Sequence, residues 1–274
     1  SLQTCKERDS MAPPTFSDLL KVASDVLGDD YTSKYLVKAK SAPSSMPVSF
    51  TIEDEIKGGK GVEGTLTCKY KEPYSGVTFD KIKLKGSKVN YEASKSIEGV
   101  KLKAKGDPTD LNSTSGSAEF KTKSYALTAA ADKKCASASA TFSPIAFGVI
   151  GCDATYTLSG GAIAYNAGLS YTFKSLFGGI IYSSKKIATL ALCWSPVPEL
   201  SVAATVDSDK KEPTVGIKYG LTPTITVGAK TTKESLALVY VNKLGKDATV
   251  VVGATSKYAD IQAKPTFGAT LTIG

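Results

Sequence analysis

The chain has 274 residues, with 34 Lys or Arg against 26 Asp or Glu, so its formal net charge is +8. It contains no histidine, which excludes histidine-based triads and zinc sites, and we predict neither an enzyme nor a bound metal or cofactor. Arg8 is the only arginine and the five cysteines include no CxxC pair, which argues against base-specific nucleic-acid contacts and against a disulfide framework.

The chain divides into three predicted parts. Residues 1–10 have no apolar core and precede a methionine, so we expect a flexible N-terminal extension there. Residues 11–33 form a predicted helical segment. Residues 34–274 show the alternation and turn signals of β-structure, and no shift in composition marks a further domain.

The helical segment has a clear start and end. Thr15 follows two prolines as a candidate N-cap, Asp18 completes a variant capping box, and Gly28 ends the helix. Its apolar stripe has helical spacing and comprises Phe16, Leu19, Val22, Ala23 and Val26. The opposite face carries Lys21, Ser24 and Asp25. At about 12–13 residues this helix is too short to cross a bilayer.

The remaining segments alternate between apolar and polar residues. The stretch "GVKLKAKG" is typical: its apolar side chains point to one face of a strand and its lysines to the other. Turn signals such as Gly160-Gly161 recur about every dozen residues. The sequence from Gly59 to Gly64 fits GxGxxG, but strand-like residues follow it, so we interpret it as a hairpin turn. Segmentation at the turns predicts about 19 strands joined by antiparallel hairpins.

The polar face of these strands determines which fold they can build. It carries mostly Thr, Ser, Gly and Lys along the whole chain, whereas a soluble sandwich buries an apolar face in a core. A sheet of about 19 strands avoids exposed edges by closing, and its lumen is then too wide for side chains to fill. The pattern favours a closed transmembrane barrel with polar residues toward water, and a soluble all-β fold stays open as the alternative.

The N-terminal stretch "MAPPTFSDLLKVASDVL" resembles the start of the mitochondrial voltage-dependent anion channels. The matching residues are Ala12, Pro13, Pro14, Thr15, Asp18, Leu19, Lys21, Ala23, Asp25 and Val26. The family's Gly-Leu-Lys-Leu stretch, proposed as a nucleotide contact, is similar to the segment that begins at Gly99 and includes Lys101. Gly28 alone stands where animal members have a glycine-rich hinge, and Glu92 is similarly placed to their membrane-facing glutamate.

This resemblance implies a 19-stranded, all-β barrel in the mitochondrial outer membrane, with the helix inside the lumen. It also implies a voltage-gated, weakly anion-selective diffusion channel for ions and anionic metabolites such as ATP and ADP. Its partners would be membrane lipid and other mitochondrial membrane proteins. A preprotein-translocase barrel and a soluble β-rich binding protein are the two alternatives.

A water-filled lumen makes lysines on the polar faces the candidate selectivity residues, because fixed positive charge raises the local concentration of anions. The predicted pore-lining residues are Lys21, Asp25, Lys101, Lys103, Lys105, Lys121, Lys123, Lys218 and Lys230. A translocase for basic presequences would instead be expected to have acidic patches in its lumen.

Overall fold

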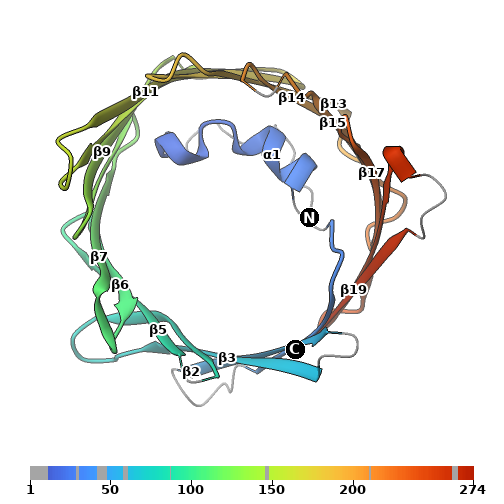
Figure 1. Ribbon diagram of the computed structural model, residues 1–274, viewed down its shortest axis with the longest axis horizontal. Helices are drawn as coiled ribbons and strands as arrows, with labels where there is room; N and C mark the ends of the chain where they lie inside the picture. The colour runs from blue at the N-terminus through green and yellow to red at the C-terminus, as the bar shows by residue number, and fades with distance from the viewer. Residues whose placement is uncertain are drawn as a thin grey trace.

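The computed structural model describes residues 12–28, 31–41, 48–57, 61–86, 88–145, 148–209, 211–260 and 265–274. Nineteen strands form one closed sheet around an open interior (Figure 1). The predicted extension 1–10 and the first two residues of the GxGxxG stretch lie outside the described residues. The part of that stretch from Gly61 onward opens a strand, as expected for a hairpin.

The strands follow one another around the barrel in chain order. They are β1 (Tyr35–Ser41), β2 (Val48–Lys57), β3 (Gly61–Lys71), β4 (Thr78–Lys85), β5 (Lys88–Ile97), β6 (Val100–Asp107), β7 (Asp110–Lys121), β8 (Tyr125–Asp132), β9 (Cys135–Ile145), β10 (Gly148–Thr157), β11 (Ile163–Phe173), β12 (Leu176–Ser183), β13 (Ala188–Val197), β14 (Leu200–Asp207), β15 (Thr214–Gly220), β16 (Ile225–Thr231), β17 (Ser235–Leu244), β18 (Ala248–Lys257) and β19 (Thr266–Ile273). Consecutive strands pair antiparallel, and β1 closes the barrel against β19 in parallel. The parallel pairing is required because the number of hairpin-linked strands is odd, so that the first and last strands run in the same direction.

The outer face of the barrel carries the apolar residues of the alternating pattern. Val100, Leu102 and Ala104 lie on this face, in register with Phe120, Ala118 and Gly116 of β7. Large apolar side chains such as Ile52, Leu169 and Trp194 are about half exposed on it. All nineteen strands have 7–12 residues, a length that suits a membrane-spanning strand.

One acidic residue interrupts this apolar face. Asp54 of β2 shares the outward parity of Ile52 and Ile56 and is paired with Val37 and Gly64 in an unbroken register. By contrast, Glu92 pairs with Lys81 and Lys105 on the inner face, so its interpretation as a lipid-facing carboxylate is wrong. A shift of one residue along a strand reverses the face of a side chain, so a similar position in the sequence does not ensure the same face.

The N-terminal segment lies inside the barrel (Figure 1). It consists of the 3₁₀ turn η1 (Phe16–Asp18) against β9 and β10, and of the helix α1 (Lys21–Gly28) against β13, β14 and β15. A second 3₁₀ turn, η2 (Tyr258–Asp260), follows β18. In the described residues no helix is long and apolar enough to cross a membrane.

The prediction of one continuous helix is wrong, because the chain turns between η1 and α1. Adjacent helical residues point about 100° apart, whereas the turn lets both Leu19 and Leu20 reach the wall. The Thr15 hydroxyl donates to the Asp18 carboxylate at 2.8 Å and makes no bond to a backbone N–H. The predicted capping box is therefore a side-chain pair.

Small residues on the inner wall make room for this segment. A Cβ placed on Gly168 would lie 2.8 Å from Leu19 Cδ2, and one placed on Gly216 would lie 2.7 Å from Leu27 Cδ2. We call the set of such residues under the segment the glycine track, and it comprises Gly151, Gly168, Gly179, Gly216, Gly228, Gly253 and Gly268. Glycines inside strands are unfavourable for pairing, and here they allow close backbone approach.

Candidate functional site in the barrel interior

Two neighbouring regions of the inner wall carry lysine at every second position. In β6 these are Lys101, Lys103 and Lys105, and the register through β5 places three lysines of β4 on the same face. We call the six together the basic wall: Lys81, Lys83, Lys85, Lys101, Lys103 and Lys105. The β4 lysines were not among the predicted site residues, although "KIKLK" shows the same alternation as β6.

The lysines of the basic wall differ in how far nearby carboxylates neutralise them. Lys85 pairs with Glu63 at 2.8 Å. Within the described part of the chain, the side chains of Lys81, Lys83, Lys101 and Lys105 form no ion pair. Glu92 is nevertheless in register with Lys81 and Lys105 on the same face, and Glu119 with Lys101, so these carboxylates offset part of the charge and the wall keeps a net positive excess.

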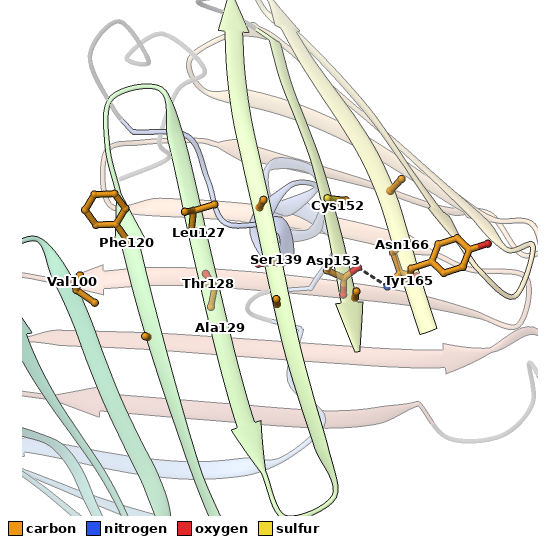
Figure 2. Close-up of a pocket in the computed structure, with 15 residues that line it drawn as sticks. Val100, Phe120, Leu127, Thr128, Ala129, Ser139, Cys152, Asp153, Tyr165 and Asn166 are labelled. Atoms are coloured by element: carbon orange, nitrogen blue, oxygen red, sulfur yellow. Dashed lines mark hydrogen bonds between the residues drawn. The ribbon is translucent and has the colours of Figure 1, made fainter. Parts of the chain in front are cut away.

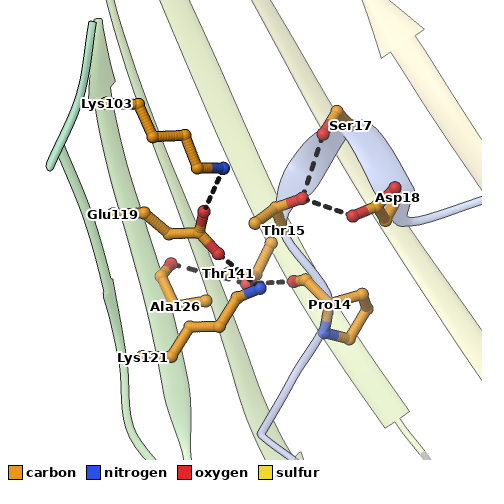
Figure 3. Close-up of polar contacts among 9 residues, drawn as sticks. All are labelled: Pro14, Thr15, Ser17, Asp18, Lys103, Glu119, Lys121, Ala126 and Thr141. Carbon is orange, nitrogen blue, oxygen red and sulfur yellow. Dashed lines mark hydrogen bonds and ion pairs between the residues drawn. The ribbon is translucent and has the colours of Figure 1, made fainter. Parts of the chain in front are cut away.

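Glu119 of β7 joins two lysines into one cluster (Figure 3). Its carboxylate lies 3.1 Å from Lys103 Nζ and 2.5 Å from Lys121 Nζ, and its side chain is 17% exposed. The cluster borders a cavity of about 820 Å³ between the wall and η1, lined by Thr15, Ser17, Asp18 and Asn166 among others. Because one carboxylate serves two ammonium groups, the cluster keeps a net charge of about one unit.

Lys218 of β15 lies beneath α1. Its side chain points to the inner face, but the residue is only 7% exposed, and its Nζ donates to the backbone carbonyl of Asp25 at 2.8 Å. The prediction that Lys218 lines the water of the pore is therefore wrong, since the helix covers it. Nothing in the local sequence of β15 indicates which strands the helix lies against.

Lys230 of β16 also lies beside the N-terminal segment. Its Nζ is 4.5 Å from the centroid of the Tyr31 ring, within the range of a cation–π contact. It faces the lumen but is half-buried. Its charge is thus directed toward the segment that follows α1.

The family to which the chain belongs follows from comparison with known proteins. The model of the eukaryotic porin family matches residues 12–268. The chain belongs to the eukaryotic porin family. Comparison with individually curated proteins gave no match. The closed barrel with a segment in its lumen agrees with this family match. The porin is a diffusion channel of the mitochondrial outer membrane. It is embedded in lipid and is not an enzyme.

The remaining predicted site residues occupy different parts of the porin. Lys21 is exposed on the lumenal side of α1, whereas Asp25 is half-buried beside Lys218. Gly28 is the last residue of α1 and is exposed, so its role as a hinge stays a prediction. The helix thus presents one exposed charge to the pore at Lys21.

Two predicted residues lie in turns at the rim. Lys123 follows the end of β7, so the predicted strand was too long there. Gly99 forms the two-residue turn between β5 and β6 with Glu98, and both have positive φ, +85° and +48°. A turn with two positive φ angles favours glycine, which accounts for Gly99 without a nucleotide.

A second cavity of about 710 Å³ lies over β6 to β11 (Figure 2). Its outer-facing lining is apolar and contains many small residues, including Ala129, Ala138 and Ala154 between Leu127 and Tyr165. Beneath it, Asn166 donates to the Asp153 carboxylate at 2.7 Å on the inner face. The cavity is a depression of the lipid-facing wall of the porin and is not part of the route through the lumen.

Proposed function

We propose that this porin is a weakly anion-selective, voltage-gated channel through which ions and anionic metabolites such as ATP and ADP diffuse. The observation that carries the anion preference is the basic wall, in which six lysines share one inner face and four of them form no ion pair among the described residues. A fixed positive field raises the anion concentration in the lumen without a tight site that would slow passage.

The same observation weighs against the translocase alternative. Basic presequences would require an acidic lumen, whereas the inner face of β4 and β6 presents alternating lysines. Membrane embedding, shown by the family match, removes the soluble alternative. Partner proteins in the mitochondrial membranes stay a prediction of the family resemblance.

We further propose that the barrel and the N-terminal segment have different roles in conduction. Residues 34–274 supply the wall and its field. The segment within 11–33 narrows the lumen and carries Lys21 into it. A charge that moves through the membrane potential gains about 2.3 kcal/mol per 100 mV, so displacement of such a segment would make conductance depend on voltage.

Selectivity measurements on wall variants test the proposal. The double variant Lys101→Glu/Lys105→Glu changes the wall by four charge units, and we expect the chloride-to-potassium permeability ratio to fall several-fold in a planar bilayer at 0.1 M salt. Lys95→Glu and the single variant Lys101→Glu make a matched pair with the same change of two charge units. Lys95 is in register with Leu102 on the outer face, so Lys95→Glu should leave the ratio unchanged. An unchanged ratio in the double variant would contradict the proposed role of the basic wall.

A further inference from the structure

Lys218 is a buried lysine that the proposed selectivity does not use. Only 7% of the residue is exposed, in register with Ser201 on one side and Gly228 on the other. Lysine is almost never buried to this extent unless its ammonium group is paired. Its Nζ donates to the Asp25 carbonyl oxygen of α1 at 2.8 Å, across 193 residues of sequence.

The carbonyl that Lys218 binds belongs to the last turn of the helix. α1 ends at Gly28, so the Asp25 carbonyl is among the four that a helix leaves without an intrahelical partner. α1 has no basic residue in its own last turn. A cation at this end is favoured by the helix dipole as well as by the hydrogen bond.

The wall around Lys218 is shaped to receive the helix at this point. Ala23, Val26 and Leu27 of α1 form one buried cluster with small wall residues, among them Cys193 and Ala203. Apolar contacts are not directional, so a hydrogen bond at this point adds a directional constraint on the position of the helix. At the other end of the segment, Thr141 of β9 donates to the Pro14 carbonyl at 2.6 Å. Wall side chains therefore hold the segment by its backbone at both ends.

We infer that Lys218 is a positioning residue: it caps α1 from the barrel wall and thereby holds the helix in its lumenal position. Without this ammonium group the last turn of α1 loses its charged donor, and the helix leaves the wall more often. The inference is independent of the anion preference, since Lys218 is covered by the helix and not exposed to passing ions.

Cys193 provides a built-in reporter of helix position. It lies on the inner wall under α1 and is 2% exposed, so a water-soluble thiol reagent reaches it only when the helix lifts. In a variant in which the other four cysteines are replaced by serine, the labelling rate of Cys193 by a membrane-impermeant maleimide measures this lifting. The refolded full-length porin in lipid vesicles is the sample.

We expect Lys218→Met to raise the labelling rate about tenfold to a hundredfold, the factor that loss of a charged hydrogen bond implies. Lys218→Arg, which retains a charged donor, should restore slow labelling. Lys95→Met removes a lysine on the outer face, away from the helix, and should leave the rate unchanged. If Lys218→Met does not fold, Lys218→Leu gives the same comparison with a shorter side chain that has no donor.

Equal rates in the wild type and in the folded Lys218→Met or Lys218→Leu variant would overturn the inference. So would fast labelling in Lys218→Arg, because a general loosening of the wall is not rescued by another cation. Circular dichroism of each variant separates a lifted helix, with the barrel signal kept, from a misfolded barrel.

Discussion

Glu119 offers a substitution that should increase the anion preference of the channel. In the native cluster its carboxylate neutralises part of the charge of Lys103 and Lys121, at 3.1 and 2.5 Å. Glu119→Gln keeps the shape of the side chain and removes one negative charge. Both ammonium groups stay in place, so the inner wall becomes more positive by one unit.

The size of the effect follows from the electrostatic potential of one added charge. An ion that passes about 10 Å away gains or loses roughly 0.4 kcal/mol in water without screening. At 0.1 M salt, with a Debye length of about 10 Å, the energy falls to roughly 0.15 kcal/mol. Because the sign is opposite for anion and cation, we expect the chloride-to-potassium permeability ratio to rise by a factor of about 1.5–2.

Salt dependence makes this prediction specific. At 0.01 M the Debye length is about 30 Å and the factor should grow to roughly 2.5–3, whereas at 1 M the effect should vanish. The assay is the reversal potential in a potassium chloride gradient across a planar bilayer. Glu212→Gln is the control, since Glu212 pairs with Lys233 at 4.0 Å in turns outside the strands and changes the total charge equally. A rise of the same size in the control, or none in Glu119→Gln, would refute the reasoning.

Two further substitutions test the outer face and the glycine track through the free energy of unfolding in lipid vesicles. Asp54→Val removes a carboxylate from the lipid-facing side of β2 and should stabilise the barrel by about 1 kcal/mol, and a loss of stability would contradict this placement. Gly168→Val inserts a side chain where Leu19 packs and should destabilise by about 1–3 kcal/mol. Gly116→Val, at a glycine with no such neighbour, is its control and should have a much smaller effect.

The barrel itself was predictable because its main signal is local. Alternation with period two marks the strands and their faces, and turn residues separate them. The outward position of Asp54 could have been predicted from the same alternation. Asp54 continues the series of Val48, Phe50 and Ile52, which lies on the apolar face. Its two acidic neighbours obscured that position.

Features that depend on where the N-terminal segment lies could not be read from the sequence. At the break between η1 and α1, two adjacent leucines, Leu19 and Leu20, each lie against a glycine of the wall. Lys218 has the same alternating surroundings as the pore-facing lysines, and only the position of α1, far away in the chain, makes it a buried donor. Periodicity identifies the inner face of a strand but not what covers that face.

The parallel pairing of β1 with β19 also has a consequence for how the chain assembles. Each of the other neighbouring pairs joins consecutive strands, so those contacts can form early and at small entropic cost. The pairing of Tyr35 with Ala269 connects the two ends of the chain and completes only when all nineteen strands are in place. Until then the first and last strands present unpaired N–H and C=O groups to lipid, which is strongly unfavourable. The pairing of β1 with β19 therefore removes both exposed edges of the sheet in a single step.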